Sequence, residues 1–345
     1  MMKKVSSLLL TLAAFLFMAV FNPAIAGDGV KKLKMQSAYP PGDATYDIHT
    51  LNTAKLIEKA GNGKIKINVF APGALCDVKE MVNAVSHGMI DIGVIYGPRY
   101  SGSVPVADVE GGLPFTWTSM DQVVELFWDP KYKLIDVIRK GWDKKNIYYF
   151  SPNACGSYPF NLTYPVHKIS DFKGHKIRGM GAAGQWLRLA GASPVVIPGG
   201  EIYMAMKLGT IDGTPFPPMG LETLKLKEVV KYMIFPGLVT PPQTCTIINK
   251  DVWEAFPDDV RKTLSDDKVV IDNYIQNGKG YQARDDVALK AAYAYGVKEI
   301  TLPPDQMKIG RKLAVEVWDK VGSKNPLSKK GVEMLKRYMT AKGLL

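Results

Sequence analysis

The chain has 345 residues, of which 46% are hydrophobic, and it carries 44 Lys and Arg against 33 Asp and Glu, for a formal net charge of +11. This hydrophobic content excludes a disordered polar chain, and the length allows two domains of ordinary size. Because the basic excess is dispersed and the N-terminus carries an export signal, we expect attraction of a small anion and no nucleic-acid partner.

Residues 1–26 are typical of a cleaved signal peptide. Lys3 and Lys4 precede an apolar run from Leu8 to Phe21, and Ala24-Ile25-Ala26 provides a small-residue cleavage site. A membrane anchor is the alternative, but the apolar run is shorter than the ~20 residues that a span requires. No cysteine lies at the cleavage point, so we predict a free soluble protein in the periplasm.

The first part of the mature chain alternates strands with helices. The predicted strands are residues 33–39, 64–70 and 89–96, and the predicted helices between them are residues 44–60 and 78–87. This β-α-β-α-β order indicates a largely parallel sheet with helices on its faces.

A second α/β set follows, and a long helical tail ends the chain. The predicted strands are residues 146–150, 176–178, 194–198 and 244–249, with a short strand opening at Ile211-Asp212, and the predicted helices are residues 183–190 and 200–208. The tail runs from Asp251 to the C-terminus, with breaks expected at Gly278-Lys279-Gly280 and at Pro303-Pro304. No low-complexity linker is present, so ordered crossing segments must join the two sets.

Arg178 is the first candidate for a binding residue. It ends a short strand immediately before Gly179-Met180-Gly181, and α/β folds place ligand-contacting side chains in such loops. Its planar guanidinium matches a carboxylate with two parallel hydrogen bonds. The alternative is a structural salt bridge, which is the usual role of an isolated arginine.

The cysteines and histidines show no catalytic or metal-binding pattern. Cys76, Cys155 and Cys245 are an odd number at wide spacing, so we interpret them as buried small residues and assign no disulfide. The four histidines share no metal-ligand spacing, and no G-x-S-x-G motif is present. We therefore predict no enzyme activity, no catalytic residue, no cofactor and no metal, with an exported hydrolase as the alternative.

Several spaced motifs together resemble one family of exported proteins. They are residues 37–42 (SAYPPG), 64–74 (KIKINVFAPGA), 84–93 (AVSHGMIDIG), 112–115 (GLPF), 171–178 (DFKGHKIR), 189–198 (LAGASPVVIP), 201–213 (EIYMAMKLGTIDG) and 249–253 (NKDVW). In this order they resemble the DctP-like substrate-binding proteins of tripartite ATP-independent periplasmic (TRAP) transporters. The resemblance covers nearly the whole mature chain.

The resemblance implies an α/β fold of two lobes, similar to type II periplasmic binding proteins, with a mixed sheet flanked by helices in each lobe and long C-terminal helices. It implies lobe I over residues 27–150 and 242–275, lobe II over residues 151–241, and a C-terminal helical segment over residues 276–345 that packs across the lobes. The implied function is capture of an organic acid and its delivery to TRAP-type integral membrane permease subunits. A sensory ligand-binding component is the alternative, and we expect a monomer while leaving a dimer open.

Two positions depart from the family's pattern after the motif that ends at Gly213. Many members have Gln-Glu-Asn-Pro there, and Phe216 takes the place of the Asn that assists the carboxylate. A branch that binds keto acids has Glu-Trp with metal help, and Pro215 takes the place of that Glu. The departures favour a monocarboxylate with an apolar or aromatic body over a sugar acid or small dicarboxylate, and they argue against a metal.

The family's motif implies that Arg178 holds the substrate carboxylate, and Phe216 stands at a position that the family uses directly. The other candidate ligand-binding residues lie at or near predicted strand ends, and they are Tyr39, Tyr96, Tyr158, Ser157 and Met180. Each has a structural alternative, because aromatic residues at strand ends often form the rim of a core. Arg99 is a further candidate anion contact, for which a surface role is the favoured interpretation.

Overall fold

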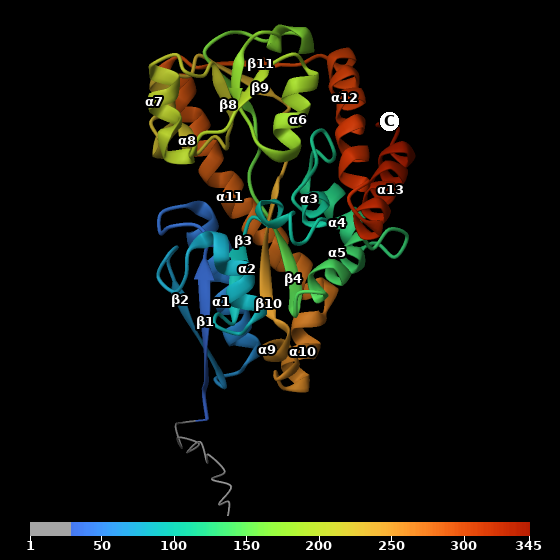
Figure 1. Ribbon diagram of the computed structural model, residues 1–345. Coiled ribbons are helices and arrows are strands. Elements are labelled where there is room, and N and C mark those ends of the chain that lie inside the picture. The colour runs from blue at the N-terminus through green and yellow to red at the C-terminus, as the bar shows by residue number, and fades with distance from the viewer. Residues whose placement is uncertain (1–28) are drawn as a thin grey trace, which may run out of the picture.

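The computed structural model describes residues 29–345, which form two lobes with one β-sheet in each (Figure 1). The predicted signal peptide, residues 1–26, lies outside the described residues. Within residues 29–345, no helix combines the length and the apolar character that crossing a bilayer requires.

The lobe I sheet has the strand order β2-β1-β3-β10-β4. Its strands are β1 (Lys31–Ser37), β2 (Ile65–Phe70), β3 (Ile92–Ile95), β4 (Ile147–Ala154) and β10 (Gln243–Asn249). Strands β1, β2 and β3 are parallel, whereas β10 runs antiparallel to both β3 and β4. The predicted alternation in residues 64–70 is confirmed, since Ile65 and Ile67 are buried while Lys66 is exposed.

The lobe II sheet has the strand order β11-β9-β5-β8-β6-β7. Its strands are β5 (Phe160–Leu162), β6 (Lys176–Arg178), β7 (Ser193–Val195), β8 (Gly213–Pro215), β9 (Tyr232–Phe235) and β11 (Lys298–Thr301). Strand β6 is parallel to β7 and β8, and β5 is antiparallel to β8 and β9. Both sheets are therefore mixed, and the predicted α/β class of the two lobes is confirmed.

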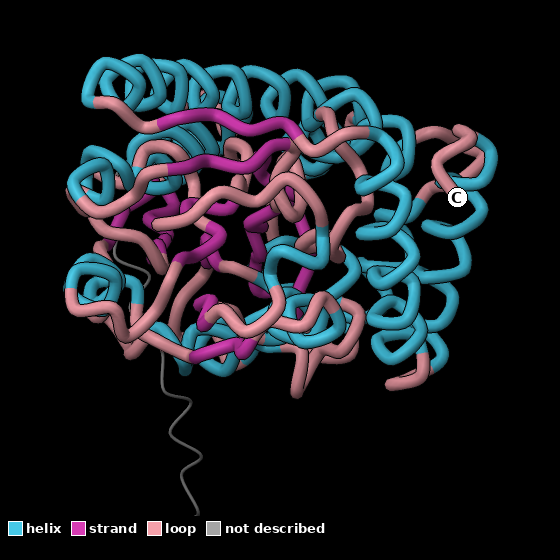
Figure 2. Tube along the Cα trace, turned by 90° about the horizontal axis from the view of Figure 1, so that it is seen from above, coloured by secondary structure: helices cyan, strands magenta, loops and turns pink. Residues whose placement is uncertain are grey.

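Helices lie around these strands on several sides (Figure 2). They are α1 (Leu51–Ala60), α2 (Met81–Ser86), α3 (Ala107–Glu110), α4 (Met120–Trp128), α5 (Leu134–Asp143), α6 (Gly181–Leu189), α7 (Ile202–Lys207), α8 (Gly220–Thr223), α9 (Lys250–Glu254), α10 (Asp258–Ser265), α11 (Asp267–Tyr295), α12 (Pro304–Gly322) and α13 (Pro326–Ala341). Side-chain caps define several of their starts: Asn325, for example, accepts the Ser328 N–H at 2.8 Å at the start of α13.

Three segments connect the lobes. Residues 155–159 lead from β4 to β5, and residues 236–242 lead from β9 back to β10. The third is α11, which packs against β4 in lobe I and against α8 in lobe II (Figure 1). Each crossing segment is short or helical, as expected for lobes without a flexible tether.

The C-terminal part differs from the prediction in two places. Helix α11 is continuous through Gly278–Gly280, where a break was expected. Gly278 is needed there for close packing, because a Cβ on it would lie 2.2 Å from Met120 Sδ and 2.9 Å from Ala154 Cβ. In addition, β11 interrupts the segment expected to be helical and pairs in parallel with β9.

Candidate functional site

Arg178 ends β6, the strand of the lobe II sheet that lies between β8 and the edge strand β7. Ile177 and Arg178 pair with β7, and Ile177 also pairs with Gly213 of β8. Gly213 permits the close approach of β5, because a Cβ on it would lie 2.6 Å from the Asn161 carbonyl oxygen. Arg178 Nε donates to the Ile197 carbonyl oxygen at 2.8 Å. This bond fixes the direction of the side chain and does not use the two terminal guanidinium nitrogens, which can face a carboxylate.

The charge of Arg178 is held in a partly desolvated place. Burial lowers its pKa, the nearby Tyr158 hydroxyl opposes that change, and the positive charge of Arg99 adds to it. Within residues 29–345, neither Arg178 nor Arg99 has an Asp or Glu carboxylate oxygen within 4.0 Å of its side-chain nitrogens. Arg99 comes from lobe I, where its side chain is exposed, and Arg178 comes from lobe II. The favoured surface interpretation of Arg99 is compatible with this exposure, although its positive charge is near enough to lower the Arg178 pKa.

The three candidate tyrosines lie near one another. Tyr39 follows β1, Tyr96 follows β3, and Tyr158 lies in the crossing segment between β4 and β5. Because β1 and β3 are parallel neighbours, their carboxyl ends meet at one edge of the lobe I sheet. Burial raises the pKa of all three phenols, and the Tyr39 pKa is raised further by Tyr158 and Tyr96. Of these candidates, Tyr158 also lies near Arg178, and its hydroxyl acts on the Arg178 pKa.

Phe216 supplies an apolar wall. It follows β8, and its ring centroid lies 6.3 Å from that of Tyr158, with the ring planes tilted by 37°. Its backbone is fixed by two hydrogen bonds: its N–H donates to the Pro159 carbonyl at 3.2 Å, and its carbonyl accepts from Asn161 Nδ2 at 2.9 Å. Pro215, at the family's Glu position, is buried and offers no side-chain ligand.

Ser157 and Met180 are less firmly connected to this group. Ser157 is half-buried next to Tyr158, and Met180 precedes α6 with 50% of its surface exposed. Within the described residues, neither side chain makes a hydrogen bond that ties it to Arg178. They stay predictions from sequence position.

Sequence reasoning missed several groups close to the tyrosines. Cys155 and the half-buried Asp43 are close enough to raise the pKa values of Tyr39 and Tyr158, and Tyr281 and Asp285 of α11 lie near the same groups. Cys155 and Cys245 are buried free thiols, as interpreted from the sequence, whereas Cys76 is partly exposed. No sequence signal pointed to Tyr281 and Asp285, because the expected break in the helical tail lies just before them.

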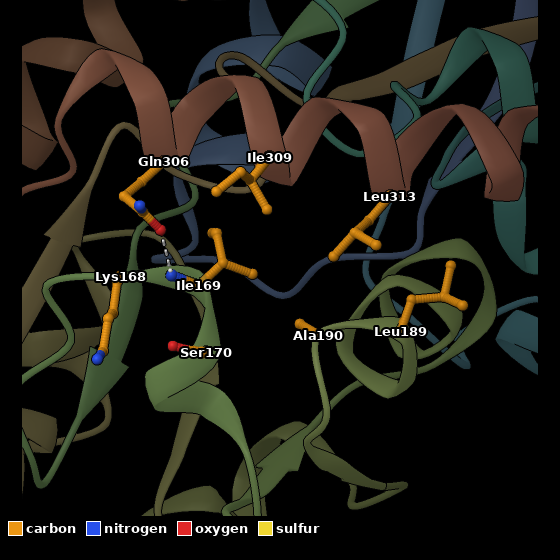
Figure 3. A pocket seen from close by; sticks show the side chains of 8 residues that line it. All are labelled: Lys168, Ile169, Ser170, Leu189, Ala190, Gln306, Ile309 and Leu313. Carbon is orange, nitrogen blue, oxygen red and sulfur yellow. Dashed lines mark hydrogen bonds between the residues drawn. The ribbon is translucent and has the colours of Figure 1, made fainter.

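A separate cavity of about 330 Å³ lies on lobe II (Figure 3). Gln306, Ile309 and Leu313 of α12 line one side of it, and Leu189 at the end of α6 lies on the other side. Gln306 points toward Ile169, and its Oε1 accepts the Ile169 N–H at 2.9 Å. None of the predicted site residues lines this cavity. Most of its lining side chains are apolar, with Lys168, Ser170 and Gln306 as the polar ones, and we assign no ligand to it.

The chemistry of the Arg178 group is that of binding. A guanidinium, three phenol hydroxyls and an aromatic ring can orient an organic anion, but no activated nucleophile is apparent among them. In the described part of the chain, no three His, Cys, Asp or Glu side chains gather in an arrangement that could hold a metal ion.

Comparisons with known proteins identify the family. A family model described as "Bacterial extracellular solute-binding protein, family 7" matches residues 37–325. A monocarboxylate 2-oxoacid-binding periplasmic protein of Nostoc sp. is 25% identical over 308 residues, which cover 88% of this chain and 83% of that protein. A sialic acid-binding periplasmic protein of Vibrio cholerae is 25% identical over 264 residues, covering 74% of this chain and 76% of that protein.

Solved structures share the fold. A TRAP periplasmic solute-binding protein from Ochrobactrum anthropi superposes with a TM-score of 0.79 at 20% identity, covering 91% of this chain and 96% of that one. Another from Pseudoalteromonas atlantica, with bound sodium and pyruvate, has a TM-score of 0.76 at 20% identity and covers 90% and 94% of the two chains. At these identities the structures support the two-lobed architecture alone.

Proposed function

This chain belongs to family 7 of the bacterial extracellular solute-binding proteins, and on that premise we propose that it captures a small organic acid in the periplasm and delivers it to a TRAP-type membrane permease. The observation that carries the proposal is Arg178, whose Nε is anchored while its terminal nitrogens are not paired with a carboxylate in residues 29–345. A desolvated guanidinium of this kind gains most from an anionic ligand. The basic excess of the chain, which remains without Lys3 and Lys4 of the predicted signal peptide, favours the approach of such a ligand.

The proposed ligand is a monocarboxylate with an apolar or aromatic body. Its carboxylate binds Arg178, phenol hydroxyls of Tyr39, Tyr96 and Tyr158 contact its polar edge, and Phe216 packs against its body. The buried Pro215 and the Phe216 ring support this choice, because they leave few polar partners for a sugar acid. The name of the Nostoc relative, a binder of monocarboxylate 2-oxoacids, is in line with it.

Capture is coupled to movement of the lobes. A ligand that bridges Arg178 in lobe II and Tyr39 or Tyr96 in lobe I stabilises the arrangement in which the lobes are close together. The crossing segments 155–159 and 236–242 are the natural hinges of such a movement. The liganded form then presents a surface that the permease distinguishes from the free form.

A thermal-shift screen of organic acids tests the proposal. An acid at about 100 times its Kd adds about 2.7 kcal/mol to the free energy of unfolding. Arg178→Ala is expected to abolish the shift, and Arg178→Lys to restore only a small part of it, because an ammonium lacks the two-pronged geometry. Arg188→Ala, which removes an exposed arginine from α6, is the matched control and should bind normally. Full binding by Arg178→Ala would refute the anchor, and stabilisation by neutral sugars alone would refute the ligand class.

A further inference from the structure

Asp285 of α11 is a buried carboxylate outside the proposed ligand contacts. It is 3% exposed, and its Oδ1 accepts the Met219 N–H at 3.0 Å. Burial raises its pKa to about 7, and the amide groups of Met219 and Ser157 oppose that rise. Its Oδ2 has no hydrogen-bond partner within residues 29–345. Burial of a charged group costs free energy, so a carboxyl group this deeply buried indicates a structural or functional role.

The Asp285 side chain fills a notch over the crossing segment. A Cβ on Gly156 would lie 1.6 Å from Asp285 Oδ2 and 3.1 Å from Tyr281 Cδ1, so only glycine lets the helix approach this closely. The next two residues are Ser157 and Tyr158, which are both site candidates. The Asp285 carboxylate thus lies directly against the backbone that presents Tyr158.

The same carboxylate holds the loop that presents Phe216. Residues 216–219 lead from β8 to α8. The N–H of Met219, at the end of this loop, donates its hydrogen bond to Asp285 Oδ1. The start of the loop is held by the Asn161 bond to the Phe216 carbonyl, and the Phe216 ring lies over Gly220, where a Cβ would come within 2.3 Å. Asp285 is therefore the contact from α11 that locks the far end of the loop.

The neighbouring residues of α11 hold the lobe I side of the site. Arg284 pairs with Asp47 at 2.9 Å, and the Tyr281 ring stacks on His49 with centroids 5.6 Å apart. These contacts fix the segment that follows Tyr39. One turn of α11, residues 281–285, consequently contacts both lobes and the crossing segment between them.

We infer that Asp285 is a positioning residue of the anion site, which sets the Phe216 and Tyr158 rings relative to Arg178 by accepting the Met219 amide and packing on Gly156. The inference rests on the proposed function for its ligand, but its structural part does not. The role requires an acceptor oxygen at this place, and it does not require a charge.

Hydrogen–deuterium exchange of the full mature chain tests the structural part without a ligand. Asp285→Ala is expected to speed exchange of the Met219 amide about tenfold, because its acceptor is lost. Asp285→Asn keeps an acceptor oxygen and should restore protection. Asp286→Asn changes the exposed neighbour on the same helix and should leave exchange unchanged. Gly156→Ala keeps the Asp285 carboxylate but displaces it, so it should speed exchange of the Met219 amide as Asp285→Ala does. It serves as the second test should Asp285→Ala fold poorly.

Calorimetry with phenylpyruvate and pyruvate tests the effect on the site. Asp285→Ala should weaken phenylpyruvate about tenfold and pyruvate much less, since pyruvate has no ring to meet Phe216. Unchanged exchange of the Met219 amide in both Asp285→Ala and Gly156→Ala would overturn the inference. Exchange in Asp285→Asn as fast as in Asp285→Ala would also overturn it, and so would an equal loss of affinity for phenylpyruvate and pyruvate in Asp285→Ala. If the unsubstituted protein binds neither acid while exchange follows the expected pattern, the ligand class is wrong and the role of Asp285 in holding the loop stands.

Discussion

Replacing Glu110 by Gln is expected to remove a large part of the pH dependence of stability. Glu110 is 1% exposed beneath the turn that carries Tyr96 and Arg99, and its Oε2 accepts from Trp142 Nε1 at 2.6 Å. A Cβ on Gly97 would lie 1.8 Å from Oε1, so the carboxyl group packs directly on the backbone of that turn. Burial raises the pKa of Glu110 to about 8, although the Trp142 N–H opposes the rise.

The sign and size of the effect follow from this pKa. The folded chain keeps a proton on Glu110 that the unfolded chain releases near its ordinary pKa of 4.5. The stabilisation that protonated Glu110 contributes is fully present below pH 4.5, decreases as pH rises from there, and is lost once pH has risen through about 8. Within this window Glu110 changes the free energy of unfolding by about 1.4 kcal/mol per pH unit, for a total of at most about 5 kcal/mol.

Urea unfolding at several pH values between about 5 and 8 measures this effect. Glu110→Gln has no proton to lose, so the difference in free energy of unfolding between variant and unsubstituted protein should move in favour of the variant as pH rises. This slope is independent of any constant cost of the new amide. Glu333→Gln, the same change at an exposed position of α13, should show no slope. A difference for Glu110→Gln that stays constant with pH would refute the assignment of a buried, protonated carboxyl group.

Two further outcomes are expected. Arg99→Gln should lower both the association rate and the affinity for the acid several-fold, because the positive charge of the exposed Arg99 is near enough to Arg178 to lower its pKa. Stopped-flow fluorescence measures the rate, and an unchanged rate at low salt would leave Arg99 without a role in binding. Burial lowers the pKa of His49 from its ordinary value of 6.5 to about 4. The stabilisation that the neutral His49 contributes is therefore fully present above pH 6.5 and is lost as pH falls to about 4, which lowers the free energy of unfolding by about 3 kcal/mol. His49→Gln should flatten this acid limb of the unfolding curve, and an equally steep limb would place the loss elsewhere.

Local patterns predicted much of the fold. The lobe I strands are accurate to within a few residues because their hydrophobic periods and Gly and Pro boundaries are strong. Strand β11 was missed because its sequence, KEIT, is short, and its pairing with β9 depends on a distant part of the chain. Helix α11 was divided because glycine propensity is a weak local signal, and the packing of Gly278 against Met120 and Ala154 overrides it.

The candidate site shows the same limit. The positions of Arg178, Tyr39 and Tyr96 at strand ends could be predicted, since strand ends at a sheet edge are visible in the sequence, and their binding roles stay predictions. Asp285 could not, because its role depends on two contacts that join distant segments: the Met219 amide and the Gly156 notch. A glycine beside the predicted Ser157 and Tyr158 was the nearest available signal, but sequence alone does not say which helix covers it.

The electrostatic surroundings of Arg178 favour an anion as its ligand. Burial lowers the pKa of Arg178, and the charged or ionisable groups that also shift it are the Tyr158 hydroxyl and the guanidinium of Arg99. Within residues 29–345, no Asp or Glu oxygen lies within 4.0 Å of the Arg178 side-chain nitrogens. A partly buried guanidinium without a paired carboxylate is costly, and under the proposed function an organic acid supplies the missing partner.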